Sequence, residues 1–236
     1  MLITKKILVF TATYNEKNNI GKLIELIKRY CLFVDILIVD DKSPDNTADE
    51  VRFLQKKFEN ILLIERKSKL GLDTAHKLAY KYSLENNYDY LITMDADLSH
   101  DPAELTNFFN NLEIYPFVIG SRYVHGGKCL MKMQRLLMSK YGNKLIKLVL
   151  GINCNEFTTS YRGFNLKKLG SFNLETVNAS GYSFFMETIF KISRKKIRIK
   201  EIPITFKDRS LGYSKLPKIE IFRTLANLII LFFKKL

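Results

Sequence analysis

Short apolar runs and longer amphipathic stretches alternate along the first half of the chain. The runs are rich in Ile, Val and Leu and read ILVFTAT, ILIVD, ILLIE, YLITMD and FVIGSRY. Between them lie stretches with helical spacing, at residues 16–30, about 47–58, 72–86 and 103–113. Strands that alternate with helices of this length predict a mainly parallel sheet with helices on both faces. We therefore expect one Rossmann-like, doubly wound α/β domain.

The pattern loosens after FVIGSRY, in the second half of the chain. An amphipathic helix with several lysines is expected at about residues 133–150, a second helix at about 182–193, and a strand at IRIKEIPITF. No proline-rich or serine-rich linker separates these elements from the first half, and no repeat is visible. We expect them to extend the same domain, which then runs over residues 1–218.

The last stretch, KIEIFRTLANLIILFFKKL, is strongly apolar, with Arg223 inside it and two lysines near its end. It is short and interrupted for a membrane-spanning helix, which needs about 20 apolar residues. We expect a helix at residues 219–236 that lies in the membrane interface. The helix at 133–150 fits two interpretations, an ordinary surface helix or one that lies on an anionic membrane through its lysines, Lys140, Lys144 and Lys147.

Composition narrows the class of protein. The 236 residues, 47% of them hydrophobic, are enough for one large α/β domain with a proper core. The net charge of +14 suits nucleic acid, an anionic membrane or a phosphorylated substrate, or else reflects a lysine-rich sequence. The three cysteines lack CxxC spacing, which argues against a disulfide framework or a zinc site, and the N-terminal residues lack the pattern of a signal peptide. We expect a cytoplasmic protein.

Polar loops follow the first, second and fourth predicted strands, where ligands of such sheets bind. The first loop, TATYNEKNNIG, lacks the glycine-rich turn of a dinucleotide fold, which argues against a nicotinamide enzyme. A diphosphate bound here would need a divalent cation held by carboxylates; the alternative for this loop is helix capping by Asn15. In the second loop, Asp41 can accept hydrogen bonds from a ribose or a base, whereas Asp45 or Asn46 is expected to cap the next helix.

The third loop, MDADLSHDP, concentrates carboxylates. Extended geometry places Asp95 and Asp97 on the same side of the chain, so both can reach one cation. Hard oxygen ligands in this arrangement select Mg²⁺ or Mn²⁺, usually shared with substrate phosphates. Asp101 precedes Pro102, with Glu104 three residues on, which is the pattern of a helix N-cap. We expect Asp101 to be structural.

Several cations in or beside predicted loops are candidates for holding a phosphate: Arg122, Arg135, Arg162, Arg209 and Lys215. Any single arginine among them, taken alone, is more often a solvated surface residue. Arg122 and Arg209 each follow a predicted strand directly, which places these two at the expected site.

Six motifs of the chain resemble, in order and approximate spacing, those of the dolichol-phosphate mannosyltransferase (polyprenyl-phosphate glycosyltransferase) group within glycosyltransferase family 2. They are TYNE, IVDDKSPDNT, MDADLSHDP, GSRYVHGG, SGYSFF with Glu187, and PITFKDRSLGYSKL. The resemblance covers roughly residues 7–220. It implies a GT-A fold with an acceptor-side extension, a GDP- or UDP-hexose donor, Mg²⁺ or Mn²⁺, and inverting transfer of a mannose- or glucose-type hexose to a polyprenyl phosphate. The enzyme would then be peripherally associated with the membrane.

The resemblance also implies roles for individual residues. The metal would be held by Asp95, Asp97 and, as in some relatives, the residue at Ser99. Contacts to the nucleotide sugar are expected from Thr13, Tyr14, Asn15, Glu16, Asp41, Asp95, Arg209 and Lys215. Contacts to the acceptor are expected from Arg122, Arg135, Ser139, Arg162 and Glu187. Catalysis itself is assigned to Asp97, Arg122 and Arg209. The chain departs from the family pattern at Glu156, Thr158, Thr159 and Ser160, at Phe185 and at Tyr213.

The type of acceptor decides whether a general base is needed. A hydroxyl acceptor must lose a proton to a positioned base, whereas a lipid phosphate is already anionic and needs only orientation by cations. The sequence offers several acceptor-side arginines and no unambiguous base, so we expect in-line attack by a polyprenyl phosphate oxygen. One alternative is a family-2 enzyme that acts on a sugar hydroxyl in surface polysaccharide assembly, with Glu187 as base. Another is a nucleic-acid-binding module, but acidic loops would repel nucleic-acid phosphates, and we expect no such partner.

Overall fold

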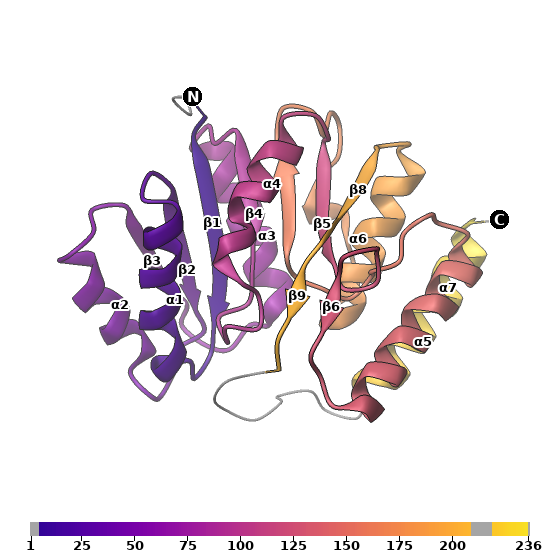
Figure 1. The fold of residues 1–236 in the computed structure, drawn as a ribbon, viewed down its shortest axis with the longest axis horizontal. Helices are drawn as coiled ribbons and strands as arrows, with labels where there is room; N and C mark the ends of the chain where they lie inside the picture. Colours follow the sequence, from indigo (N-terminus) through magenta and orange to yellow (C-terminus); the bar gives the residue numbers. More distant parts are fainter. Residues whose placement is uncertain (1–4, 209–218, 236) are drawn as a thin grey trace.

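A seven-stranded sheet lies at the centre of the computed structural model, which describes residues 5–208 and 219–235. The strand order is β3-β2-β1-β4-β7-β5-β8 (Figure 1). Neighbouring strands are parallel except β7, which is antiparallel to both β4 and β5. The strands are β1 (Ile7–Thr13), β2 (Asp35–Asp40), β3 (Ile61–Glu65), β4 (Tyr90–Thr93), β5 (Phe117–Ser121), β7 (Arg162–Asn165) and β8 (Ile199–Pro203). A separate ribbon pairs β6 (Lys128–Cys129) with β9 (Thr205–Phe206).

Helices cover both faces of the sheet, because strand side chains alternate between two apolar clusters. Val9 and Ile38 belong to the cluster under α1 (Lys17–Tyr30), α2 (Thr47–Gln55) and α4 (Leu105–Leu112). Phe10 and Val39 belong to the cluster under α3 (Leu72–Glu85), α5 (Met133–Leu150), α6 (Tyr182–Arg194) and α7 (Ile219–Lys235). The predicted doubly wound, mostly parallel α/β sheet is confirmed.

Strand β7 is an element of the central sheet that the hydrophobic pattern does not predict, because its four residues contain no apolar run. It fits between β4 and β5 under α4, where a Cβ on Gly163 would lie only 2.9 Å from Cδ1 of Leu112. Arg162, its first residue, pairs with Thr93 at the end of β4. Since β7 is antiparallel, the residues before it arrive at the carboxyl edge of the sheet, where the polar loops are.

The C-terminal helix α7 packs beside α5 and α6 (Figure 1). Leu228 and Leu231 are buried in the same apolar cluster as residues of α5 and α6. At its end, the carbonyl of Lys235 accepts a hydrogen bond from Arg194 (3.4 Å), and the ammonium of Lys235 donates to the carbonyl of Val149 (3.4 Å). Within residues 5–208 and 219–235, no helix combines the length and the hydropathy of a membrane span.

Candidate active site

The loops that follow β1 and β2 hold each other in place. The hydroxyl of Thr13 donates to Oδ1 of Asp40 (2.7 Å), and the amide of Glu16 donates to Oγ1 of Thr47 (3.0 Å). Glu16 is the N-cap residue of α1, and the amide of Lys17, the first residue of the helix, donates to Oδ2 of Asp45 (3.1 Å). The predicted nucleotide-sugar loop therefore lies at the carboxyl edge of β1, fixed from the side by the next loop.

Asp41 organises the loop at residues 66–71, which leads into α3. Nε of Arg66 donates to Oδ1 of Asp41, and the amides of Leu70 and Gly71 donate to Oδ2 (3.2 and 3.1 Å). Arg66 also donates to the hydroxyl of Thr74 (2.6 Å). Both oxygens of Asp41 thus have protein donors, so Asp41 shapes this loop, and its contact with a nucleotide stays a prediction.

Two cations on this loop were missed at the sequence level, Arg66 and Lys69. The ammonium of Lys69 lies 4.0 Å from the ring centre of Tyr14, a cation–π contact between the loops that follow β3 and β1. The signal that could have revealed them is the position of RKSKLG, a basic loop directly after the third predicted strand. They place positive charge beside the acidic strand ends.

Residues 95–100, here named the aspartate turn, follow β4 and contain the three predicted metal ligands. Asp97 is buried, and its Oδ1 accepts the amide of Ser99 (3.1 Å). Asp95 is partly exposed, and its Oδ1 accepts the hydroxyl of Ser160 (2.5 Å). Oγ of Ser99 is buried without a hydrogen-bond partner among the described residues. One turn therefore carries two carboxylates and the hydroxyl of Ser99. Among the buried side-chain atoms of the turn, only the Ser99 oxygen lacks a hydrogen-bond partner within the described residues.

The helix start after the turn agrees with the prediction for Asp101. Its Oδ1 accepts the amide of Ala103 (3.1 Å), at the beginning of a 3₁₀ turn at Pro102–Glu104 that leads into α4. Its other oxygen pairs with the ammonium of Lys207 (3.0 Å). The N-cap role of Asp101 is confirmed, and its carboxylate is structural.

Arg122 follows β5 directly and is buried against Glu156. Its Nε and Nη2 donate to the two oxygens of Glu156 (2.8 and 3.1 Å), and Nη2 also donates to Oγ1 of Thr158 (3.2 Å). Burial alone would raise the pKa of Glu156, but the charge of Arg122 and the hydrogen bonds from Arg122 and Thr158 outweigh it and lower that pKa. Burial would lower the pKa of Arg122, and Glu156 raises it. The pair is ionised, and Nη1 of Arg122 has no hydrogen bond within the described residues.

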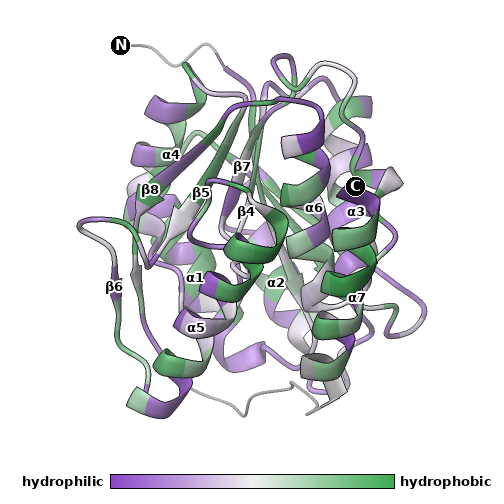
Figure 2. Cartoon of the chain, turned by 90° about the vertical axis from the view of Figure 1, so that its right-hand side faces the viewer, coloured by the Kyte–Doolittle hydropathy of each residue, from purple (hydrophilic) through white to green (hydrophobic). Residues whose placement is uncertain are grey.

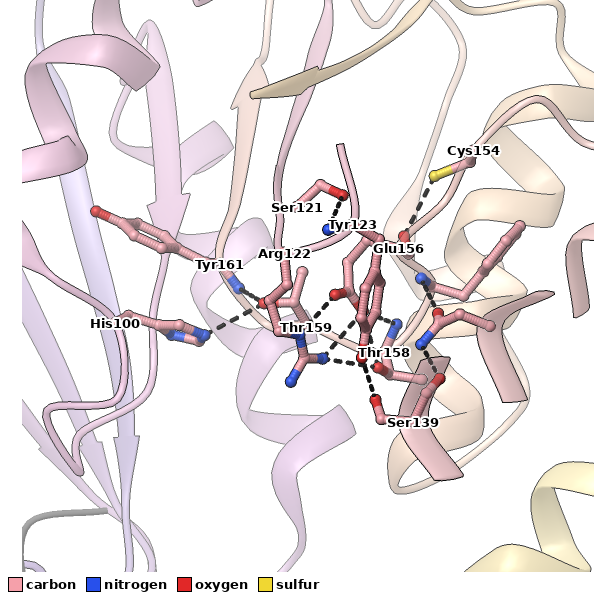
Figure 3. A network of polar contacts seen from close by, with 12 residues as sticks. His100, Ser121, Arg122, Tyr123, Ser139, Cys154, Glu156, Thr158, Thr159 and Tyr161 are labelled. Atoms are coloured by element: carbon pink, nitrogen blue, oxygen red, sulfur yellow. Dashed lines mark hydrogen bonds and ion pairs between the residues drawn. The ribbon is translucent and has the colours of Figure 1, made fainter. Parts of the chain in front are cut away.

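Residues 156–162, here named the bridging segment, connect Arg122 with the aspartate turn (Figure 3). Glu156 and Thr158 bind Arg122, as described above. On the other side, Oγ1 of Thr159 lies 3.2 Å from Nε2 of His100, and the rings of Tyr161 and His100 stack with centroids 4.9 Å apart. The sequence marks residues 156–160 of this segment as a departure from a family pattern and Arg162 as a candidate acceptor contact, whereas the structure shows that the segment joins the two halves of the site.

Arg162 anchors the bridging segment from behind. It is 1% exposed, and its guanidinium donates to the backbone carbonyls of Phe157, Thr159 and Phe185 (3.0, 2.8 and 2.9 Å). Burial lowers the pKa of this guanidinium to about 9, so it stays protonated at neutral pH. The expectation that Arg162 contacts the acceptor is corrected, because its donors face protein carbonyls in the interior.

Two further acceptor-side predictions lie together on α5. The hydroxyl of Tyr123 donates to Oγ of Ser139 (2.7 Å), and the guanidinium carbon of Arg122 lies 5.3 Å from the ring centre of Tyr123. Arg135 lies one turn before Ser139 on α5 and pairs with Asp208 (2.8 Å). Arg122 and Ser139 are thus joined through Tyr123. The predicted donor-side residues Arg209 and Lys215 lie outside the described residues.

Glu187 has a structural position on α6. Its Oε2 accepts the amides of Asn178 and Ala179 (3.2 and 2.7 Å), and its other oxygen pairs with Lys191, one turn further along α6 (3.4 Å). The side chain is buried. These contacts stay within α6 and the loop before it, and Oε1 is buried without a hydrogen-bond partner among the described residues. An acceptor contact or a role as general base therefore stays a prediction.

Two known proteins are similar to this chain over most of its length. The chain is 34% identical over 218 residues to the polyprenol monophosphomannose synthase of Mycolicibacterium smegmatis, covering 90% of this chain and 82% of that protein. It is 33% identical over 212 residues to the undecaprenyl-phosphate mannosyltransferase of Micrococcus luteus, covering 89% of this chain and 87% of that protein. The resemblance to the polyprenyl-phosphate glycosyltransferase group is confirmed.

The fold is shared with a solved structure of low sequence identity. The crystal structure of glucosyl-3-phosphoglycerate synthase from Mycobacterium tuberculosis, in complex with Mn²⁺, uridine diphosphate and glucosyl-3-phosphoglycerate, matches with a TM-score of 0.69 at 13% identity. The match covers 98% of this chain and 80% of that chain, and the fold is GT-A. The sequence model of an enzyme family, described as glycosyl transferase family 2, matches residues 8–171. The chain therefore belongs to glycosyl transferase family 2.

Proposed function

We propose that this enzyme transfers a mannose- or glucose-type hexose from a nucleotide diphosphate sugar to a polyprenyl phosphate, with inversion and with a divalent cation. The similar protein from Mycolicibacterium smegmatis is named as a synthase of polyprenol monophosphomannose. The one from Micrococcus luteus is named as an undecaprenyl-phosphate mannosyltransferase. The Mycobacterium tuberculosis structure contains Mn²⁺ and uridine diphosphate. The observation that carries the proposal is Arg122, held ionised by Glu156 and linked through the bridging segment to the aspartate turn.

The aspartate turn fits a hard divalent cation. Asp95 and Asp97 supply carboxylate oxygens, and the buried Oγ of Ser99, without a partner in the described residues, supplies a further oxygen. Such all-oxygen ligand sets suit Mg²⁺ or Mn²⁺. When bound, the cation would neutralise charge on the diphosphate leaving group. The protein itself holds the turn and keeps both carboxylates at the edge of β4.

The acceptor side suits an anion that needs no general base. Glu156, the carboxylate beside Arg122, is fully buried, and its oxygens accept hydrogen bonds from Arg122 and Thr158. It cannot take a proton from a hydroxyl acceptor. Nη1 of Arg122, in contrast, can donate to an anionic phosphate and orient it. One phosphate oxygen of the lipid then attacks the anomeric carbon while the bond from that carbon to the diphosphate breaks.

A transfer assay with a donor panel tests this function. Purified enzyme would be incubated with Mg²⁺ or Mn²⁺, a short polyprenyl phosphate, and one labelled donor at a time from a set of GDP- and UDP-hexoses. We expect label in the lipid fraction with one donor and none when the polyprenyl phosphate is replaced by the corresponding polyprenol. Label that enters an added saccharide but not the lipid would favour the hydroxyl-acceptor alternative instead.

The helix pair formed by α5 and α7 gives the proposed enzyme a surface for the membrane. Figure 2 views this side, with green turns recurring along both helices. Beyond the residues that pack inward, large apolar side chains point outward from both: Leu137, Tyr141, Leu145 and Leu148 on α5, and Phe222, Leu225, Ile229 and Phe233 on α7. Exposed lysines accompany them, Lys140, Lys144, Lys234 and Lys235. An apolar face with basic neighbours suits an anionic bilayer, and we propose peripheral association through this helix pair.

Charge placed on this face should weaken membrane binding. Leu148 is 79% exposed and Ile229 is 58% exposed, so Leu148→Glu with Ile229→Glu leaves the core intact. Each buried apolar side chain contributes about 1.5–3 kcal/mol, so the double variant should bind anionic liposomes at least about a hundredfold more weakly. Co-sedimentation with liposomes measures this. Phe53→Glu, at a side chain 65% exposed on α2, is the matched control and should bind like wild type. Equal sedimentation of the double variant and the control would rule out this face.

A further inference from the structure

We infer that His100 is a positioning residue for the metal-binding aspartate turn, acting through the backbone of Asp95. The inference rests on the metal site of the proposed function. His100 closes the turn that begins at Asp95, and its imidazole is buried. Figure 3 shows it at the end of the polar network, where it meets Thr159. Its role is to fix where the Asp95 carboxylate points, without touching substrate or cation.

The hydrogen bonds of His100 determine which ring nitrogen carries its proton. Nδ1 of His100 lies 3.1 Å from the amide nitrogen of Asp95 and accepts its hydrogen. The proton of the neutral ring is therefore on Nε2, which donates to Oγ1 of Thr159 at 3.2 Å. The amide of Tyr161 donates to the same hydroxyl oxygen (3.2 Å). A chain of hydrogen bonds thus runs from the bridging segment through His100 to the peptide that carries the first metal ligand.

The ring is also fixed in orientation by its aromatic neighbours. Tyr161 stacks on one side at an interplanar angle of 29°, and Phe206 of β9 meets the ring edge-on, with centroids 5.7 Å apart. Phe206 also lies under the guanidinium of Arg122, whose central carbon is 4.5 Å from the ring centre. The imidazole can therefore not rotate away from the Asp95 amide without displacing residues on both sides of the site.

The aspartate turn needs such a constraint because its backbone is strained. Leu98 has a φ of 63°, in the left-handed region that residues with side chains rarely adopt. Two hydrogen bonds inside the turn oppose its relaxation, from the amide of Ser99 to Oδ1 of Asp97 and from the amide of Asp95 to Nδ1 of His100. From outside the turn, the hydroxyl of Ser160 holds the Asp95 carboxylate (2.5 Å). Without the hydrogen bond to His100, the backbone of the turn is held less firmly at Asp95, and the Asp95 carboxylate can shift relative to that of Asp97.

The tautomer can be measured on the unaltered protein. The chain has only three histidines, His76, His100 and His125, so ¹⁵N-histidine labelling with His76→Gln and His125→Gln variants assigns the ring signals. We expect His100 to be neutral with its proton on Nε2. A proton on Nδ1 would overturn the inference, because Nδ1 could then not accept the amide of Asp95. This measurement does not depend on whether any His100 variant folds.

Two substitutions at His100 separate positioning from packing. In His100→Asn the amide oxygen takes the place of Nδ1 and can still accept from Asp95, whereas in His100→Gln the side-chain amide takes the place of Nε2. We expect His100→Gln to raise the dissociation constant for Mn²⁺ about 10- to 100-fold, the range for lost partners of metal ligands, and His100→Asn to raise it much less. Electron paramagnetic resonance of free Mn²⁺ measures this with and without nucleoside diphosphate, on protein shown to be folded by circular dichroism.

His76→Gln is the matched control, since His76 is equally buried but packs against Phe10 and Phe185, away from the aspartate turn. It should leave the Mn²⁺ affinity unchanged. Equal weakening by His100→Asn and His100→Gln, or by the control, would overturn the inference while leaving the proposed function standing. A wild-type protein that binds no Mn²⁺ under these conditions would instead contradict the proposed metal site itself.

Discussion

Replacing Asp97 by asparagine is expected to reduce the rate of sugar transfer about a thousandfold, the largest effect on activity that the structure predicts. Asp97 is buried in the aspartate turn, and its Oδ1 accepts the amide of Ser99. Asparagine can keep that hydrogen bond, so the turn keeps its shape. What the variant loses is one negative charge at the proposed cation site, and with it the means to place a cation against the diphosphate.

Initial rates with labelled donor and short polyprenyl phosphate, over a range of Mn²⁺ concentrations, measure this effect. Asp49→Asn is a matched control, since Asp49 is an exposed aspartate on α2 whose partner is Arg52, and it should retain full activity. An Asp97→Asn enzyme that stays within tenfold of wild type at every cation concentration would contradict the assignment of Asp97. Unchanged circular dichroism is needed to show that the loss is not one of folding.

The parts of the molecule that follow a local pattern could be predicted from the sequence. The parallel strands are continuous apolar runs, so the doubly wound sheet and the edge that carries the polar loops follow from periodicity. For the same reason the sequence correctly predicted that Asp101 begins a helix before Pro102 and that Arg122 directly follows a strand. These features depend on residues within a few positions of one another.

The parts that could not be predicted depend on pairing between distant segments. β7 is a strand only because β4 and β5 accept it between them, and its sequence, RGFN, carries no strand signal of its own. Arg162 therefore resembled a loop cation, although three backbone carbonyls hold it in the interior. Glu156 and His100 were likewise invisible as partners, because Arg122 and Thr159 are far from them in sequence.

Removing the charge of Glu156 is expected to have the largest effect on stability. Glu156→Gln keeps the shape of the side chain but leaves Arg122 buried without a counter-charge. Breaking a buried ion pair by removing one partner typically costs about 3–5 kcal/mol of unfolding free energy. Glu25→Gln is the matched control, because Glu25 pairs with Lys57 at the surface, where a pair contributes at most about 1 kcal/mol. Urea unfolding followed by circular dichroism measures both, as the chain has no tryptophan.

The pH dependence of this stability difference identifies its cause. The pKa of Glu156 is lowered in the folded protein from its usual 4.5, against its burial, by Arg122 and by hydrogen bonds from Arg122 and Thr158. A group with a lowered folded pKa stabilises the protein fully above its unfolded pKa and loses that contribution as the pH falls through the folded value. The difference in unfolding free energy between wild type and Glu156→Gln should therefore be largest at neutral pH and shrink below about pH 4.5. If this free-energy difference stays constant down to the lowest pH at which the protein folds, the lost stability arises from packing rather than from the charge that orients Arg122.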